Sequence, residues 1–459
     1  MLKKAGRVLA TFLIALSAAA ALSLALPPAA ARAPQATSPA PAVDPAAKQA
    51  IVDQIADLLN KNYVFPETAK KIEDALRAAL KSGALDAPAT ASAFAQAVSR
   101  ILADVGKDRH MGFAYNPAAA EDLRKIMGQS EDEARKVRER QLEESRRDNF
   151  GFRRVEQLAG NVGYLDFRVF DSPAQAGPTA IAALNFLAYC DAIIVDLRQN
   201  GGGDPAQIQL MCSYFFDQPA HLNDIYDRAS GAVENYWTLP FVPGPKPVDA
   251  DLYVLTSARS FSGAEEFAYN IKNLKRGTII GETTGGGAHP TQGMIVQKDY
   301  ILRVPYARSV NPVSKTNWEG TGVTPDISVP AAEAFDRAYA LALEKLAAKA
   351  ADPQRKAALE WTLAAVKAKA HPAAVDEGTL KSYVGVYGER KITLDGGSLY
   401  YQRIGPKYRL IPMTPTMFLA DGLDNFRVEF TLKDGAVVAL VGLYDDGRRE
   451  PSPRSKPEK

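Results

Sequence analysis

The sequence of this 459-residue chain predicts an α/β domain between an N-terminal helical bundle and a small, all-β C-terminal domain. Three observations predict this arrangement. Strand-like and helix-like segments alternate between residues 159 and 330, as in α/β domains. Between residues 47 and 117, apolar residues recur at helical spacing, which is typical of a bundle. From residue 372 to 447, alternating segments separated by Asp-Gly turn signals indicate a β-barrel-like accessory domain.

The first residues of the chain have the features of a secretion signal. Three basic residues among the first seven precede an apolar run, and Ala29-Ala30-Ala31 offers a small-residue cleavage site. The run approaches the length of a membrane span, but it is rich in Ala and Ser and ends at Pro27-Pro28. We therefore expect residues 1–31 to be cleaved, residues 32–46 to form a disordered tether, and the mature protein to be periplasmic or secreted without a stable membrane anchor.

Charge and cysteine content exclude several kinds of function. The formal net charge is +2 and no basic block with interleaved aromatic residues occurs, so nucleic acid is not an expected partner. The two cysteines, Cys190 and Cys212, lie in apolar segments, and two buried free thiols are expected rather than a bridge. Neither has a Cys or His neighbour at metal-ligand spacing. We expect neither a metal nor an organic cofactor, and the oligomeric state stays open.

Composition divides the rest of the chain. Residues 118–158 are densely charged, which predicts a solvated helical connector. Residues 331–371 are rich in Ala and predict a helical linker, interrupted near a proline. Residues 448–459 are charged and contain prolines, so we expect a disordered tail.

The α/β segment is organised around residues 251–287, which predict a strand, a sharp turn, a helix and a second strand. The helical pattern begins at Ser262-Gly263. Unsatisfied N–H groups at a helix N-terminus can hold a developing negative charge, so this serine is a candidate nucleophile. The alternative is that Ser262 only caps the helix, which is a common role for serine. Ser257 and Ser260 offer two further hydroxyls in the same loop.

A second loop of interest follows the apolar strand near residues 191–197. It contains Gly201-Gly202-Gly203, where the lack of side chains permits close backbone approach. The alternative interpretation is a plain tight turn. Asp196 and Arg198, at the end of the strand, are expected to form a structural pair.

Three stretches, TSARSFSGAEEFAYNIKNLKRGTIIGETTGGGAHP, IIVDLRQNGGGDP and NWEGTGVTPDISV, resemble the tail-specific (C-terminal processing) serine peptidases. The resemblance is greater to the branch that contains the tricorn core protease and the interphotoreceptor retinoid-binding protein repeats. It covers roughly residues 51–330 and implies a crotonase-related (ClpP/crotonase-like) peptidase core. The PDZ domain usual among the processing proteases is not expected, because the interval 118–160 is too short for one.

The resemblance implies roles for several residues. It selects Ser262 as the nucleophile, with the N–H groups of Gly263 and Gly202 as the oxyanion hole. The processing proteases use a Ser–Lys dyad, but Gly287 stands where their lysine would be. Another group must therefore deprotonate the serine.

The motif DRHMGF resembles the segment from which the tricorn-like branch supplies a histidine, which makes His110 the expected base. An imidazole with a pKa of about 6.5 suits this task at neutral pH. His289 is the runner-up and, with Gly286, a substrate-side candidate. Glu319 matches an acidic position that helps to arrange the active site in that branch. It could orient His110, act through a second hydroxyl, or be a solvated loop residue.

The sequence thus predicts an exported serine peptidase that cleaves peptide or protein substrates through an acyl-enzyme, with a histidine base instead of a Ser–Lys dyad. One alternative is a non-catalytic protein that binds apolar ligands on the same fold. Another is a hydrolase of a different bond, such as an ester.

Overall fold

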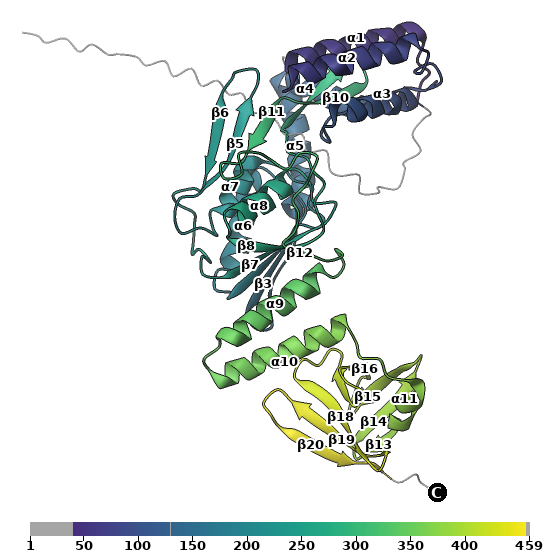
Figure 1. The fold of residues 1–459 in the computed structure, drawn as a ribbon, viewed down its shortest axis with the longest axis vertical. Coiled ribbons are helices and arrows are strands. Elements are labelled where there is room, and N and C mark those ends of the chain that lie inside the picture. Colours follow the sequence, from purple (N-terminus) through teal and green to yellow (C-terminus); the bar gives the residue numbers. More distant parts are fainter. Residues whose placement is uncertain (1–39, 129, 456–459) are drawn as a thin grey trace, which may run out of the picture.

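The computed structural model describes residues 40–128 and 130–455. The predicted signal peptide and most of the predicted tether lie outside this range. Figure 1 shows the helical bundle at one end of the molecule, the α/β domain in the middle and the β domain at the other end. This arrangement confirms the predicted fold class.

The N-terminal bundle packs against a small sheet whose strands come mostly from the α/β segment. Its helices are α1 (Pro45–Asn62), α2 (Pro66–Lys81) and α3 (Ala91–Gly106). The antiparallel sheet has the order β1-β10-β9, with bounds Gly112–Tyr115, Tyr300–Pro305 and Thr291–Val296. One apolar core joins these elements. The predicted tether ends earlier than expected, because Ala42 pairs with Thr90 and α1 begins at Pro45.

The charged segment that follows is helical only in part. It forms α4 (Pro117–Met127) and α5 (Glu131–Arg147), and then β2 (Phe152–Leu158). The prediction of a helical connector up to residue 158 is therefore wrong for its last seven residues. β2 is an edge strand that exposes Arg153 and Arg154 while Phe152 enters the core, so its composition resembles that of a solvated helix.

The central sheet has six strands in the order β12-β8-β7-β4-β3-β2, all parallel except β2. The parallel strands are β3 (Val162–Phe167), β4 (Ala192–Asp196), β7 (Asp251–Thr256), β8 (Gly277–Gly281) and β12 (Ile327–Ser328). One face packs on α6 (Pro173–Phe186), α7 (Pro205–Cys212) and α8 (Gly263–Asn273). Successive side chains point to opposite faces, so these apolar strands need a cover on the second face as well.

The cover is α9 (Ala334–Lys349), which lies in the segment predicted as a linker. The helical structure and its interruption near Pro353 agree with the prediction, and α9 additionally covers the sheet, because its alanines pack closely on it. α10 (Pro353–Ala370) then packs on α9 and reaches the β domain. There the Trp361 indole N–H donates to the Asp424 carbonyl at 2.8 Å, and the Arg427 guanidinium lies 3.6 Å from the Trp361 ring centroid.

A second three-stranded sheet, of order β11-β5-β6, lies toward the helical bundle and contacts α7 and α8 (Figure 1). Its strands are Ala307–Val310, His221–Asp227 and Val233–Trp237. Cys190 and Cys212 are buried and unbridged, as expected. Asp196 and Arg198 form the expected pair, with a closest N–O distance of 2.6 Å, and the Tyr164 hydroxyl donates to the same carboxylate.

The C-terminal domain is a meander of antiparallel strands preceded by α11 (Glu377–Tyr383). The strands, in spatial and chain order, are β13 (Gly385–Tyr387), β14 (Arg390–Asp395), β15 (Ser398–Gln402), β16 (Tyr408–Pro412), β17 (Met417–Ala420), β18 (Phe426–Lys433), β19 (Ala436–Tyr444) and β20 (Arg449–Pro453). A bridge between Tyr387 and Arg454 joins the first strand to the residue after the last. This closure supports the barrel-like prediction.

The same closure contradicts the predicted disordered tail for residues 449–455. β20 pairs with β19, and the Ser455 N–H donates to the Val386 carbonyl at 2.8 Å. The segment contains two prolines, which lack an N–H and favour sheet edges, so its sequence does not read as a strand.

In residues 40–128 and 130–455, no helix combines the length and apolar character that crossing a bilayer requires.

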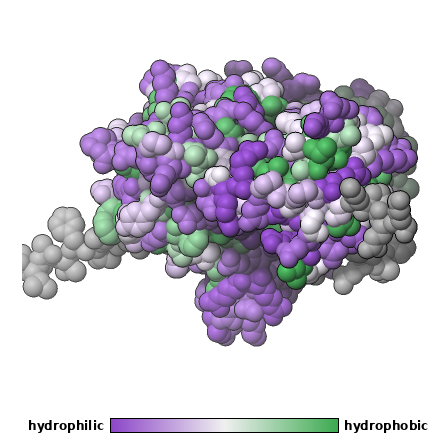
Figure 2. Space-filling view, turned by 90° about the horizontal axis from the view of Figure 1, so that it is seen from below, coloured by the Kyte–Doolittle hydropathy of each residue, from purple (hydrophilic) through white to green (hydrophobic). Residues whose placement is uncertain are grey.

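Figure 2 shows the molecule from the end of the C-terminal domain, where hydrophobic residues are scattered among hydrophilic ones.

Candidate functional site

The turn between β7 and α8 places Ser262 at the N-terminus of α8 in a strained backbone conformation. Its φ and ψ angles are 55° and −120°, a combination that L-residues rarely adopt. Strain of this kind persists where the surrounding structure enforces it, and it concentrates at functional turns. The Ser262 hydroxyl donates to no acceptor among the described residues.

The other two serines of this loop have structural hydrogen bonds instead. The Ser257 hydroxyl donates to the Arg198 carbonyl at 2.6 Å, and the Ser260 hydroxyl donates to the Leu197 carbonyl at 2.7 Å. Both side chains are buried. Their protons are engaged with the end of β4, which leaves Ser262 as the candidate nucleophile of this loop.

The glycine turn after β4 lies directly against the Ser262 turn. A Cβ on Gly202, whose φ is 95°, would lie 2.5 Å from the Gly263 nitrogen and 2.7 Å from the Ser262 Cβ. The structure therefore brings Gly202 and Gly263 together, as expected. However, the Gly202 N–H donates to the Asn200 side-chain oxygen at 2.8 Å, so this predicted oxyanion donor is already engaged.

The N–H groups of Gly203 and Gly263 have no acceptor within the described parts of the chain. A Cβ on Gly263 would lie 2.9 Å from the Gly203 nitrogen, so these two groups are neighbours. Two unpaired backbone donors beside a serine are the elements of an oxyanion hole. Asn200, which the sequence reading missed, holds this turn because its carbonyl also accepts the Phe261 N–H at 3.1 Å.

His110 comes from the loop between α3 and β1 and packs against the nucleophile turn. Its ring centroid lies 4.6 Å from that of Phe261, the residue before Ser262. A Cβ on Gly287 would lie 2.5 Å from the His110 Cε1 atom. The ring therefore occupies the space in which any side chain at position 287 would begin.

Burial lowers the pKa of His110 to about 4; Asp108 opposes this shift, whereas His289 and Arg303 reinforce it. The imidazole is 6% exposed, and its Nδ1 atom has no hydrogen-bond partner among the described residues. At neutral pH it is therefore uncharged and able to accept a proton. No hydrogen bond joins His110 to Ser262, and in unliganded enzymes such bonds often form only when substrate binds.

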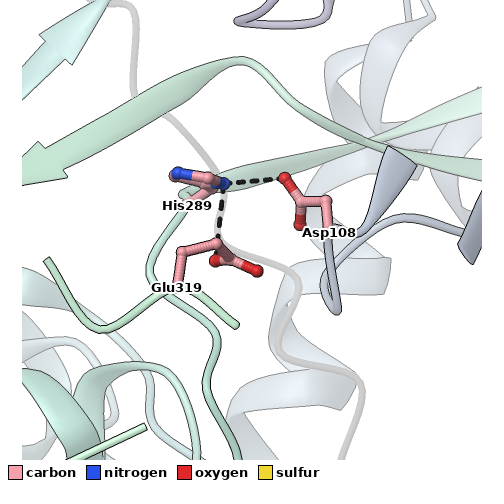
Figure 3. A group of neighbouring side chains, drawn as sticks. All are labelled: Asp108, His289 and Glu319. Atoms are coloured by element: carbon pink, nitrogen blue, oxygen red, sulfur yellow. Dashed lines mark hydrogen bonds and ion pairs between the residues drawn. The ribbon is translucent and has the colours of Figure 1, made fainter. Parts of the chain in front are cut away.

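His289 lies in a different set of contacts (Figure 3). Its Nδ1 atom is 2.7 Å from Asp108 Oδ2 and 3.4 Å from Glu319 Oε2. Glu319 accepts the N–H groups of Arg109 at 3.2 Å and Ala288 at 2.6 Å. Burial raises the pKa of Glu319, and Asp108 raises it further. Glu319 thus contacts His289 and the backbone next to His110, but not the His110 ring.

Asp108, His289 and Glu319 bring three potential metal-ligand atoms within 4.8 Å of one another, a cluster that sequence spacing did not predict. The oxygens of this cluster already have donors. In addition to its contact with His289, Asp108 accepts hydrogen bonds from the backbone N–H of His110 and from the Tyr63 hydroxyl. Both Glu319 oxygens accept backbone N–H groups. This arrangement favours a hydrogen-bonded Asp–His pair over a metal site.

Glu265 is a site residue to which the sequence motifs assigned no catalytic role. In the structure it is fully buried and accepts four hydrogen bonds at the site. The signal that could have identified it is the pattern Ser-x-x-Glu at a helix start, which is typical of a capping box. Gly286 is one of its donors, so the structure gives this predicted substrate-side residue a contact with the carboxylate.

Comparison with known proteins adds a family assignment to this geometry. Residues 161–329 match the description "Peptidase family S41". Among solved structures, a photosystem II D1 C-terminal processing protease is 15% identical with a TM-score of 0.41, covering 62% of this chain and 93% of that chain. A lipoprotein from Streptococcus agalactiae is 13% identical with a TM-score of 0.43, covering 68% of this chain and 100% of that chain. The tricorn protease is 15% identical with a TM-score of 0.40, covering 65% and 37%.

Proposed function

From the match of residues 161–329 to peptidase family S41, we propose that this protein is a serine-type peptidase that acts on peptides or proteins. Ser262 is the nucleophile, His110 is the general base, and the reaction proceeds through an acyl-enzyme. The observation that carries this proposal is the strained Ser262 turn, which stands at a helix N-terminus beside two unpaired backbone N–H groups.

The choice of His110 as base rests on the space at position 287. In a Ser–Lys dyad enzyme of this kind, a lysine side chain would begin there. Here the His110 ring fills that space and packs on Phe261. Burial keeps the imidazole neutral, which is the form that accepts a proton, but its pKa of about 4 makes it a weaker base than the imidazole of pKa about 6.5 expected from the sequence.

The reaction then follows from these positions. As the Ser262 oxygen bonds to the scissile carbonyl carbon, its proton passes to the imidazole of His110. The carbonyl oxygen becomes an oxyanion, and the N–H groups of Gly203 and Gly263 stabilise it. When the carbon–nitrogen bond breaks, the imidazolium returns the proton to the leaving amine. Water then attacks the acyl-enzyme ester and loses a proton to His110; as the ester bond breaks, the imidazolium returns that proton to the Ser262 oxygen and the carboxylic acid product is released.

The cluster of Asp108, His289 and Glu319 has a positioning role in this scheme. The Asp108 carboxylate accepts the backbone N–H of His110 at 3.0 Å and so holds the loop that carries the proposed base. Glu319 accepts the backbone N–H groups of Arg109 and Ala288. It therefore joins the loop that carries His110 to the segment that follows Gly287. His289, which is paired with Asp108, faces the substrate side.

Fluorophosphonate labelling tests the nucleophile and the absence of a catalytic metal together. The probe should modify wild-type protein at Ser262, as mapped by peptide mass spectrometry, and should not modify Ser262→Ala. Labelling and peptide hydrolysis should persist in the presence of a chelator, because the mechanism uses no metal. Modification at another serine, or chelator-sensitive activity that zinc restores, would contradict the proposal. Hydrolysis of esters but not peptides would identify a different hydrolase.

We also propose that the protein is exported by a cleaved signal sequence. The support is the charged and apolar pattern of residues 1–31 with its small-residue cleavage site. N-terminal sequencing of protein from the extracytoplasmic fraction should begin near Arg32. A membrane-bound protein that retains Met1 would contradict export by cleavage.

A further inference from the structure

Glu265 accepts hydrogen bonds from two separate segments at the candidate active site. Its Oε2 atom accepts the N–H of Ser262 at 2.8 Å and the N–H of Gly287 at 2.9 Å. Its Oε1 atom accepts the N–H of Gly286 at 2.6 Å and the hydroxyl of Thr284 at 2.5 Å. One carboxylate thus joins the nucleophile turn to the glycine loop of residues 284–287.

The glycine loop is the wall against which the base packs. The His110 ring lies where a Gly287 side chain would begin, and the Phe261 ring fills the same space. The Gly287 carbonyl accepts the Trp318 indole N–H at 2.6 Å, so the loop is held on its other side as well. The position of Gly287 relative to Ser262 therefore controls the position of His110 relative to the nucleophile.

Glu265 also reaches the loop that carries Glu319. The Thr284 hydroxyl, which donates to Glu265, accepts the Val323 N–H at 2.7 Å. Displacement of the Glu265 carboxylate would therefore weaken the attachment of the 284–287 loop both to α8 and to the loop that carries Glu319.

A helix cap alone does not account for these contacts. A capping box needs one bond from the Glu side chain to the N-cap N–H and is satisfied by an exposed Glu. Glu265 is fully buried, has no ion pair with any described cation, and makes three of its four bonds to the glycine loop. Burying a carboxylate is costly unless donors compensate, and here all four donors belong to the site.

We propose that Glu265 is a positioning residue: its carboxylate fastens the Ser262 turn to the 284–287 loop and thereby sets the approach of His110 to the nucleophile. This inference rests on the proposed roles of Ser262 and His110.

The titration of Glu265 offers a readout that a merely structural residue would not have. Burial raises the pKa of Glu265 to about 7, although its four hydrogen bonds oppose the shift. The pKa of His110 is lowered to about 4. If activity requires ionised Glu265 and neutral His110, kcat/KM rises with pH through the higher of the two pKa values. That higher pKa belongs to Glu265. The other titratable groups on the segments around it are Glu266, His289 and Glu319.

The test compares two adjacent buried glutamates of α8. Glu265→Gln replaces one acceptor oxygen by an NH₂ group, which cannot accept the N–H hydrogen bonds made at that position. We expect kcat to fall about 100-fold with KM within about threefold, because the loss is of transition-state geometry. The rise of kcat/KM near pH 7 should disappear. The matched control is Glu266→Gln, because Glu266 is 4% exposed and makes none of these bonds. It should retain both kcat and the pH dependence.

Two further variants keep the inference testable if Glu265→Gln does not fold. Thr284→Val removes one donor to the carboxylate, which should raise the pKa of Glu265 and move the rise of kcat/KM to higher pH. Glu265→Asp keeps the charge but shortens the side chain, so kcat should fall while a pH-dependent limb remains.

Three outcomes would overturn the inference: wild-type kcat in folded Glu265→Gln, a rise near pH 7 that survives in Glu265→Gln, or an unshifted rise in Thr284→Val. The labelling of wild-type Ser262 separates the two levels of the argument. If Ser262 is labelled and these variants behave like wild type, only the role of Glu265 is wrong. If wild-type Ser262 is not labelled, the proposed function itself is wrong.

Discussion

Replacing Ser262 or His110 with alanine is expected to reduce kcat for peptide hydrolysis by about 10⁴-fold or more. The serine oxygen forms the acyl bond, and the imidazole takes the proton that this attack releases. Because the two groups act as one unit, the double variant should be little worse than either single variant. The measurement is kcat and kcat/KM of the three variants on one peptide substrate, with thermal unfolding as a check that each protein folds.

His289→Ala serves as the comparison in the same experiment. His289 is hydrogen-bonded to Asp108 and lies 3.4 Å from Glu319, so its loss should act mostly on KM if it only faces the substrate. A dead His289→Ala beside a nearly active His110→Ala would show that the base has been assigned to the wrong histidine. An active Ser262→Ala would contradict the serine mechanism.

Gly287→Ala is expected to have the second-largest effect, with kcat reduced about 100-fold or more, because misplacing a catalytic group by about 1 Å has an effect of this size. The added methyl group would lie 2.5 Å from the His110 Cε1 atom and would overlap the Phe261 ring. One of these two rings must move, and His110 is the proposed base. The measurement is kcat with the labelling rate at Ser262.

The matched control for this variant is Gly320→Ala. Gly320 lies in the neighbouring loop, and a Cβ there would meet no atom within 4 Å, although its φ of 71° makes the substitution mildly strained. It should lose some stability and little activity. Wild-type kcat in Gly287→Ala would mean that the His110 ring is not held in a catalytically relevant position. Gly287→Lys is likewise not expected to restore a Ser–Lys dyad, because the His110 ring occupies the space that the lysine needs.

Local patterns in the sequence were sufficient to predict the fold class. The apolar run of β4, the helical spacing in α8 and the alternation in β18 each report on residues that are close along the chain. The motif around Ser262 was visible for the same reason, because a strand, a turn and a helix start lie within a few residues. The family match over residues 161–329 agrees with the predicted family of this segment.

Local patterns did not reveal the packing partner of α9, which is distant in sequence, and they predicted β2 and β20 incorrectly. α9 was predicted as part of a helical linker, and the prediction did not include its packing on the face of a sheet built from residues 162–281. β2 and β20 were predicted as a charged helix and a disordered tail. Each pairs with the strand next to it in the chain, β3 and β19 respectively, and the charged residues of β2 and the prolines of β20 obscured the strand pattern.

The candidate site divides in the same way between sequence and tertiary structure. Local motifs and the family resemblance that they carry predicted Ser262, Gly263 and His110 as site residues, since a resemblance of this kind depends on particular side chains at particular positions. Hydrogen bonding in the folded chain, both within one turn and between distant segments, decided the rest. It engaged the Gly202 N–H with Asn200, paired His289 with Asp108 across 181 positions of the chain, and buried Glu265 under the glycine loop. Which N–H is unpaired, and which carboxylate is buried, depends on packing between segments far apart in the chain, and this is why the fold had to be known.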